Sequence, residues 1–219
     1  MLLAGSVVDR LPSAKYTSEL SFAELTLRAP LPRAASLRKM RANAPEELVL
    51  ALRAPRSTIA SASGPLRFDA ALERSFAWLL EAREALAAKL VVLPTPADLS
   101  TGQRDRDLLA AFAERLPRET GRHYVWAPSG PWEPASAEPV ARELGLVLAF
   151  DPLRDPRPAG SVAYAQLRAI GARRSFSESV LEDVVALLSA EPDSESFVAV
   201  EAPRGHTHAI RLQQLAGAP

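Results

Sequence analysis

Three acidic residues stand at or near the ends of apolar runs in different parts of the chain. Glu24 lies in one such run, Asp151 comes directly before Pro152, and Glu201 comes two residues before Pro203. Carboxyl groups that converge can act as general acid and base or hold a divalent cation. No spacing motif links positions so far apart, and an aspartate before a proline is also typical of a turn cap. A shared catalytic role is therefore one hypothesis, and ordinary salt bridges or turn caps are the other.

Three arginines form the cationic counterpart of these acids. Arg28 and Arg53 occupy the same place in two Leu-Arg-Ala-Pro sequences, two residues before the proline, and Arg168 ends a later apolar run. If they point to one place, they could hold a phosphate or carboxylate through paired N–H groups. The alternative is that they neutralise the acids in a buried charged layer, which favours a unique arrangement more than it adds stability.

The sequence His206-Thr207-His208 contains two of the three histidines of the chain. In a strand, residues two apart face the same side and could bind a metal. This segment follows Arg204-Gly205, however, and is typical of a loop before a helix, and no third ligand stands at a recognisable spacing. We therefore predict no metal site, keep a nuclease-like metal centre as a remote alternative, and expect His206 to contact a ligand.

Trp126 and Trp132 are candidates for stacking against a sugar or a base. Core packing is the expected role of Trp126. Trp132 is flanked by Pro131 and Pro134, so we expect partial exposure and contact with a ligand or a partner. No glycine-rich phosphate loop and no nucleophile elbow are present, and we predict no cofactor.

The elements that would position these side chains follow from the prolines. Six apolar runs end at or just before one, at Pro30, Pro55, Pro94, Pro128, Pro152 and Pro203. A proline cannot donate to a strand ladder, so it marks a strand end. The apolar runs predict eight strands: Leu2–Val8, Ala23–Leu27, Leu48–Arg53, Leu90–Leu93, His123–Ala127, Leu146–Phe150, Val162–Leu167 and Phe197–Val200.

Helical periodicity fills the segments between most of these strands. It predicts helices over Ala35–Asn43, Leu72–Lys89, Gln103–Leu116, Ser136–Glu143, Glu178–Ala190 and Thr207–Leu215. Strands alternating with helices indicate an α/β fold, and eight units indicate a TIM-type (β/α)8 barrel. The segment from Arg10 to Ser21 shows only a hint of helix, so we predict a barrel that is shortened or degenerate in its first βα units.

Composition limits the class of protein. The 219 residues suit a single domain over residues 1–219, and 26 basic residues balance 26 acidic ones, which argues against nucleic acid as a partner. There is no cysteine, no basic leader segment and no apolar run of membrane-spanning length. We expect a cytoplasmic protein, and the Ala, Arg, Leu and Pro usage is typical of a GC-rich bacterial genome.

Several segments resemble the YecE-like family, domain of unknown function 72, whose members are TIM-type barrels. The most specific match is Leu48–Ser57, which ends in Ala-Pro-Arg-Ser and is similar to the family block FAVKAPRSITH. Further segments are similar to LFQLPP, AVEFRHPSW, VALVLAD, YVRLHG and the last family block; they are Leu90–Pro94, Tyr124–Trp132, Leu146–Asp151, Tyr164–Arg168 and Phe197–Leu212. The resemblance implies the barrel fold and a site at its carboxyl-terminal face, where Gln166 and Arg168 take the places of the arginine and histidine of YVRLHG and are expected ligand contacts.

The departures from the family pattern affect the polar positions. Glu24 is retained, but apolar or altered residues stand where the family has polar ones, as at Ala60, Val92, Trp126, Pro128, Gln166, Arg168, Glu201 and Ala202. We therefore predict a divergent member that has lost most of its polar barrel mouth and acts as a pseudoenzyme, a non-catalytic binding or scaffold protein with a protein partner or a second copy of itself.

The alternative is a hydrolase- or isomerase-like enzyme acting on a small phosphorylated or sugar-like anion. Arg28, Arg53 and Arg168 would then bind the anion, and one of the three acids would serve as base. The residues do not decide between these two functions.

Overall fold

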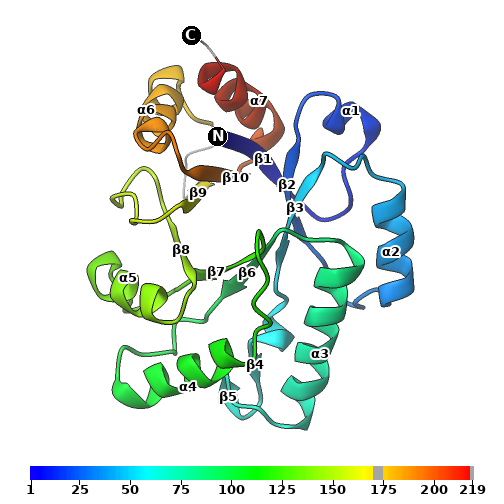
Figure 1. Cartoon of the computed structure of the whole chain (residues 1–219), viewed down its shortest axis with the longest axis vertical. Helices are drawn as coiled ribbons and strands as arrows, with labels where there is room; N and C mark the ends of the chain where they lie inside the picture. Colours follow the sequence, from blue (N-terminus) through cyan, green and yellow to red (C-terminus); the bar gives the residue numbers. More distant parts are fainter. Residues whose placement is uncertain (170–174, 218–219) are drawn as a thin grey trace. The chain divides into compact units, whose positions relative to one another are not determined.

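The computed structural model describes residues 1–169 and 175–217. Eight strands form a closed barrel in the order β1-β10-β9-β8-β7-β6-β3-β2 (Figure 1). The strands are β1 (Leu2–Val8), β2 (Phe22–Thr26), β3 (Val49–Arg53), β6 (Leu90–Pro94), β7 (His123–Ala127), β8 (Val147–Phe150), β9 (Val162–Arg168) and β10 (Glu195–Glu201). All eight expected strands are confirmed to within a residue or two, and the TIM-type barrel is confirmed.

The helices are α1 (Ala14–Thr17), α2 (Ala34–Ala42), α3 (Ala70–Ala85), α4 (Gln103–Glu114), α5 (Pro134–Glu143), α6 (Glu178–Ser189) and α7 (Gly205–Ala216). The shortened first units are confirmed, since α1 has four residues and α2 nine, whereas α3 has sixteen. Residues 151–161, between β8 and β9, form no helix. A 3₁₀ turn η1 (Arg56–Thr58) and a hairpin of β4 (Ala60–Ser61) and β5 (Gly64–Pro65) follow β3.

The chain divides into two compact units. The first comprises Met1–Leu25, Ala44–Val49 and Ala149–Pro219, and the second comprises Thr26–Asn43 and Leu50–Leu148. The single domain expected over residues 1–219 stays a prediction. In the first unit, α7 packs on β1 and β10 and lies beside α6 (Figure 1). The α6 stripe of Leu181, Val184 and Leu188 is buried, as its 3.6-residue period indicates.

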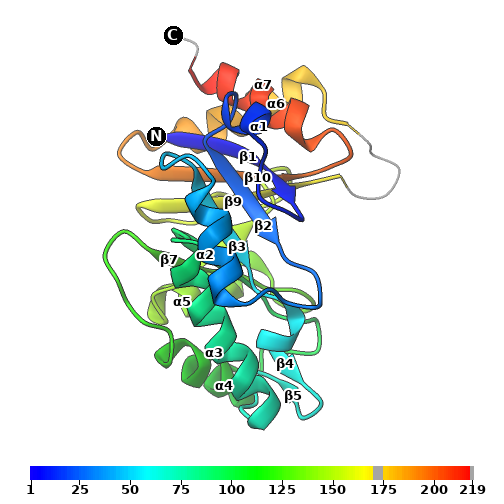
Figure 2. The ribbon, with the colours of Figure 1, turned by 90° about the vertical axis from the view of Figure 1, so that its right-hand side faces the viewer.

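In the second unit, α2 and α3 lie side by side and the β4–β5 hairpin sits near the start of α3 (Figure 2). Asp69 caps α3 by accepting hydrogen bonds from the backbone N–H groups of Ala71 and Leu72 at 2.9 and 2.8 Å. Helix α2 buries only Leu37, and the indole N–H of Trp78 in α3 donates to the carbonyl oxygen of Pro32 at 2.8 Å. The exposed side of α2 is therefore almost entirely polar or small.

Backbone pairing between β1 and β2 is short, and a tyrosine hydroxyl completes it. The two strands pair only where Val7 and Val8 meet Glu24 and Leu25. Below that point the backbone N–H of Ser6 donates to the Tyr16 hydroxyl at 2.8 Å, and the same hydroxyl donates to the carbonyl oxygen of Phe22 at 2.7 Å. Burial raises the pKa of the Tyr16 phenol, so it keeps its proton. Tyr16 thus satisfies two buried backbone groups that the shortened connection leaves unpaired.

Gly5 is required in β1 by a close approach of the backbone of β2. A Cβ atom at Gly5 would lie 2.0 Å from the carbonyl oxygen of Phe22 and 2.6 Å from its carbonyl carbon. We expect Gly5→Ala to lower the free energy of unfolding by about 1–3 kcal/mol, because the strands must move apart to admit the methyl group. Urea denaturation measures the change.

Gly102→Ala is the matched control, because its new Cβ would meet only the Ser100 hydroxyl at 3.3 Å. Equal effects of the two substitutions would contradict the close approach as the reason for Gly5.

Candidate functional site

Aromatic rings from three strands show which side of the first unit's strands faces the barrel interior. Phe22 of β2 lies edge-on to Tyr164 of β9, with ring centroids 6.4 Å apart, and its centroid is 5.3 Å from that of Phe197 of β10. Strands β2 and β9 are separated by β1 and β10 in the barrel order, so these rings meet across the interior. The parallel register then places Gln166 and Arg168, which follow Tyr164 at steps of two, on the same interior face.

Glu24 lies deep in this interior rather than at its rim. Its side chain is fully buried, and so is Tyr164, whose hydroxyl donates to the Glu24 carboxylate. Both residues have further interactions within the chain. A buried carboxylate is tolerated only when hydrogen bonds replace its water shell, and Tyr164 supplies one of them. No local motif in the sequence indicates Tyr164 as a site residue, because the acid it contacts lies 140 residues away.

A polar group at the carboxyl ends of β9 and β10 forms the candidate site. An Arg168 N–H donates to the Gln166 side-chain oxygen, and the Nε of Arg168 lies 3.4 Å from the Glu201 carboxylate. The Arg168 and Glu201 side chains are 40% and 46% exposed, whereas Gln166 is only 7% exposed. The amide nitrogen of Gln166 is buried and has no hydrogen-bond partner among the described residues. Three of the expected site residues thus come together, and two buried donors, the Gln166 amide nitrogen and the Arg168 Nε, are left without a hydrogen bond in the part of the chain that the structure describes.

Asp151 does not join them in any contact found among the described residues. Its carboxylate accepts a hydrogen bond from the backbone N–H of Leu153 at 3.0 Å and lies 3.6 Å from Arg154, while its own backbone N–H donates to Asp155 at 2.9 Å. These contacts are those of a turn cap. The geometry therefore supports a structural role for Asp151, which is to cap the turn after β8.

Arg28 and Arg53 are not equivalent, although both stand in a Leu-Arg-Ala-Pro sequence. Arg53 is the last residue of β3, half-buried and in register with Val92 of β6, whereas Arg28 lies two residues beyond the end of β2 and is exposed. Both have interactions within the chain. The shared tetrapeptide therefore does not give the two arginines equivalent positions, because β2 ends at Thr26 and β3 runs on to the arginine itself.

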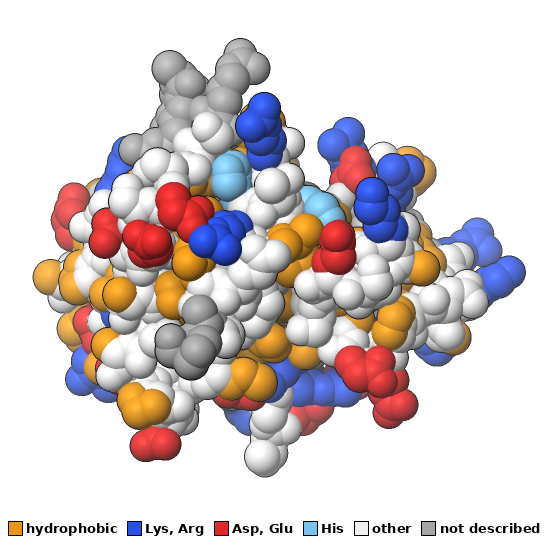
Figure 3. Space-filling model, turned by 90° about the horizontal axis from the view of Figure 1, so that it is seen from above, with side chains coloured by type: hydrophobic (Ala, Val, Ile, Leu, Met, Phe, Trp, Pro, Cys, Tyr) orange, Lys and Arg blue, Asp and Glu red, His pale blue; other side chains and the backbone are white. Residues whose placement is uncertain are grey.

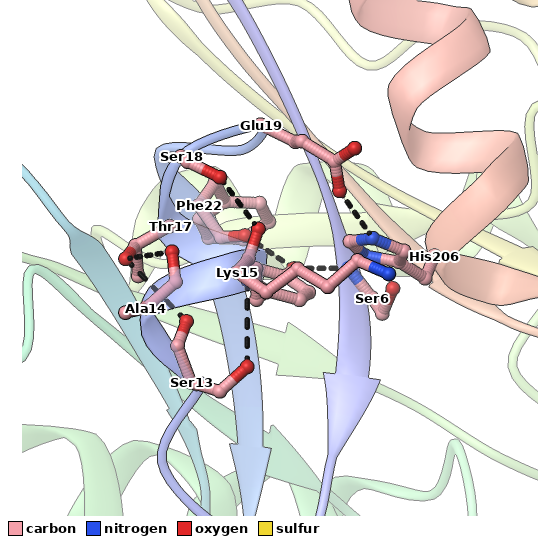
Figure 4. Close-up of polar contacts among 10 residues, drawn as sticks. Ser6, Ser13, Ala14, Lys15, Thr17, Ser18, Glu19, Phe22 and His206 are labelled. Carbon is pink, nitrogen blue, oxygen red and sulfur yellow. Dashed lines mark hydrogen bonds and ion pairs between the residues drawn. The ribbon is translucent and has the colours of Figure 1, made fainter.

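The first turn of α7 carries both histidines, and they point to different partners. The imidazole of His206 lies 2.8 Å from the Glu19 carboxylate and packs on the Tyr16 ring at 5.0 Å between centroids, beside Ser6 (Figure 4). His208 is 7% exposed, and its Nε2 accepts a hydrogen bond from the backbone N–H of Phe176 at 3.3 Å. His206 therefore ties α7 to the segment between β1 and β2.

A metal centre on this pair does not fit the geometry. Residues two apart in a helix point about 200° apart, so His206 and His208 cannot face one ion from α7. Among the described residues no three side chains of His, Asp or Glu gather closely enough to hold a metal ion. The alternative of a nuclease-like metal site is not supported by the residues present.

Trp132 is buried, so the expected partial exposure is wrong. It is 7% exposed, its indole N–H donates to the carbonyl oxygen of Leu99 at 2.9 Å, and its ring meets Trp126 edge-on at 4.8 Å. The guanidinium of Arg106 lies 5.6 Å from the ring centre. These contacts enclose the ring, and little of it is left for a ligand.

A cavity of about 390 Å³ lies at the amino-terminal end of β7 and is lined by residues 117–124 and Gly145. Its cations are engaged in structure: Arg118 donates to the carbonyl oxygens of Leu144 and Gly145, and Arg122 pairs with Glu84 and Glu119. These contacts stabilise the loop and engage both of these arginines within the chain. We therefore place the candidate site at β9 and β10.

Comparison with known proteins supports the fold. No family model and no curated protein matches the chain. A DUF72 family protein from Thermotoga maritima is similar over the full length of both chains with a TM-score of 0.70 and 14% identity. A DUF72 family protein from Enterococcus faecalis, covering 100% of this chain and 98% of its own, has a TM-score of 0.67 and 12% identity. Endonuclease IV from Thermus thermophilus has a TM-score of 0.60 and 12% identity, covering 97% and 98%.

These similarities establish the barrel fold and no residue assignment. The fold that the resemblance to the YecE-like family implied is confirmed by two DUF72 structures. None of the described helices combines the length and the apolarity that crossing a membrane requires.

Tyr164→Phe tests the role of the buried hydroxyl. The substitution removes a donor to the buried Glu24 carboxylate, so we expect the free energy of unfolding at neutral pH to fall by about 1–3 kcal/mol in urea denaturation. Tyr124→Phe is the control, because the Tyr124 hydroxyl is buried without a hydrogen-bond partner and its loss should cost little. A larger effect at Tyr124 than at Tyr164 would contradict the assigned pair.

Because His208 is buried, we predict that the folded protein loses stability in mild acid. Burial, and then the positive charge of Arg204, lower the pKa of the His208 imidazole below its ordinary value of 6.5. The unfolded chain therefore binds a proton that the folded chain resists, so stability is complete above pH 6.5 and falls as the pH drops towards the folded pKa. We expect His208→Gln to flatten the dependence of the melting temperature on pH between about 7 and 5. If the melting temperatures of the variant and of the unaltered protein change with pH in parallel, groups other than His208 cause the pH dependence.

Proposed function

We propose that this protein binds a small anion, a carboxylate or phosphate group of a metabolite-sized ligand, at the carboxyl ends of β9 and β10, and that it performs no acid–base catalysis there. The observation that carries the proposal is the unpartnered amide nitrogen of Gln166, buried beside Arg168. Buried donors are nearly always satisfied, so an unsatisfied one next to a cation is a natural place for an anionic acceptor.

Glu201 acts in this proposal as an internal counter-ion. It sits at 3.4 Å from the Arg168 guanidinium and is about half exposed, so water screens the attraction between the two groups. A ligand anion would take its place on Arg168 and accept a second hydrogen bond from Gln166. In this geometry a ligand anion replaces the Glu201 carboxylate on Arg168, so the binding site does not have to be an empty pocket.

The absence of catalysis is proposed from the engagement of the three acids. Glu24 is buried against Tyr164, Asp151 caps a turn, and Glu201 pairs with Arg168. A general base must reach the proton it abstracts, and none of these carboxylates stands open beside the others. This supports the binding-protein hypothesis over the hydrolase- or isomerase-like alternative.

One observation favours the enzyme hypothesis. The Glu24–Tyr164 pair lies on the interior side of β9, two residues below Gln166, which is about 7 Å along a strand. A ligand that reached past Gln166 would meet an acid and a phenol. Turnover of a bound phosphate ester that is abolished by Glu24→Gln would establish this second function.

The proposed function is tested by titrating inorganic phosphate and small carboxylates against the protein in a calorimeter. We expect Arg168→Ala to weaken binding roughly 10- to 100-fold, the value of one or two charge-assisted hydrogen bonds, and Glu201→Gln to strengthen it because the competing carboxylate is gone. Arg154→Ala is the control: it removes an exposed cation from the turn after β8 without touching the group.

The proposal is wrong if no anion of the panel binds, or if Arg168→Ala binds as tightly as the unaltered protein. Weaker binding in Glu201→Gln would likewise contradict the counter-ion role, since it would make Glu201 part of the ligand contact.

A further inference from the structure

Balanced total charge hides a strong separation of charge along the chain. Residues 25–45 contain five basic residues and no acidic one: Arg28, Arg33, Arg38, Lys39 and Arg41. Residues 175–203 contain seven acidic residues and no basic one: Glu178, Glu182, Asp183, Glu191, Asp193, Glu195 and Glu201. The first stretch contains α2 and the second contains α6, so each helix presents one sign of charge.

The basic surface is the exposed side of α2. Arg38 and Lys39 are exposed there together with Ala35 and Ala42, on the side away from the buried Leu37. Among the described residues neither Arg38 nor Lys39 forms an ion pair or a hydrogen bond. Alanines beside them leave both cationic groups projecting, and Figure 3 shows basic side chains standing out at the edge that α2 occupies in Figure 1.

The acidic surface is the exposed side of α6. Glu182 and Asp183 are exposed opposite the buried stripe of the helix, and neither forms an ion pair among the described residues. Glu178, by contrast, is held by Arg211 of α7 at 2.7 Å. Acidic side chains gather on the part of the molecule that α6 forms in Figure 3. Glu182 and Asp183 thus face solvent outside any described ion pair, although the charge of Arg211 in α7 also acts on Glu182.

We propose that the basic side of α2 in one copy of this chain docks on the acidic side of α6 in a second copy. The charges are complementary, and the two helices are of similar length, about 14 and 18 Å for nine and twelve residues. Among the described residues Met1 is the one exposed large hydrophobic side chain, so an apolar contact does not compete with this electrostatic one. Each copy offers one surface of each sign, so the contact is head-to-tail and builds short chains or a ring.

Such a contact is weak and depends on salt. Exposed ion pairs contribute little individually, and salt screens them over a distance of about 10 Å at 0.1 M and about 30 Å at 0.01 M ionic strength. We therefore expect the association at low ionic strength and high protein concentration, and we expect added salt to dissociate it. It is independent of anion binding at Arg168.

The test is an exchange of charge between the two helices, read by sedimentation or light scattering at about 0.01 M and about 1 M salt. We expect the unaltered protein to exceed the monomer mass at low salt only. The double variants Arg38→Glu/Lys39→Glu and Glu182→Lys/Asp183→Lys should each be monomeric. Mixing them in equal amounts should restore the larger species, because the acidic α2 of one then meets the basic α6 of the other.

Arg74→Glu/Arg104→Glu is the matched control, since it reverses two exposed arginines on α3 and α4 outside the basic stretch and should leave the association unchanged. Far-ultraviolet circular dichroism checks that every variant is folded. The proposal is overturned if the unaltered protein is monomeric at low salt, if the reversals leave its mass unchanged, or if the mixture stays monomeric. A monomer whose α2 binds duplex DNA with the same salt dependence would assign the surface to a polyanion instead.

Discussion

The register between β9 and β10 is the constraint on which the candidate site depends. Seven consecutive parallel pairs run from Val162 with Glu195 to Arg168 with Glu201. Because side chains alternate between the two faces of a strand, this register sets Tyr164 beside Phe197 and Arg168 beside Glu201 on the same face. A slip of one residue would turn the whole polar set towards the helices and the apolar set towards the interior. Backbone pairing, more than any contact between the polar groups, therefore creates the site.

The interior of the first unit changes character from its middle to its rim. Around Phe22 and Tyr164 the side chains are fully buried, and a carboxylate there survives only with hydrogen-bond donors of its own. At the rim, Arg168 and Glu201 are nearly half exposed, so water screens their attraction and either partner can be replaced. The same chemical groups are thus structural in one layer and exchangeable in the next. Depth along the barrel axis is what separates the two roles.

The shortened first βα unit has a specific replacement for the helix it lacks. One tyrosine hydroxyl accepts from Ser6 and donates to Phe22, and the Tyr16 ring packs against His206 of α7. Glu19 of the same segment contacts the Nε2 of that imidazole at 2.8 Å. A four-residue helix could not cover β1 and β2 by hydrophobic packing alone, so polar contacts to α7 complete the cover. This part of the barrel depends on individual hydrogen bonds where the others depend on apolar area.

Strand and helix positions could be predicted because they depend on local chemistry. Continuous apolar runs, six of which end at a proline, located all eight strands, and 3.6-residue periodicity located α3 to α7. The barrel class followed from their alternation, with support from the Ala-Pro-Arg-Ser block. The separation of charge was also present in the sequence, where a net charge of zero concealed it.

Contacts between distant residues could not be predicted, since they depend on how the sheet closes. Glu24 is 140 residues from Tyr164 in sequence, and the two meet only because the barrel brings β2 opposite β9. Arg28 and Arg53 share a tetrapeptide, yet one lies in a strand and one beyond it, because strand ends are set by pairing with neighbours. The burial of Trp132 likewise depends on Trp126 and Leu99 as neighbours, which no local pattern contains. Local preferences thus determine which segments are strands and helices, whereas packing in three dimensions determines which side chains become partners.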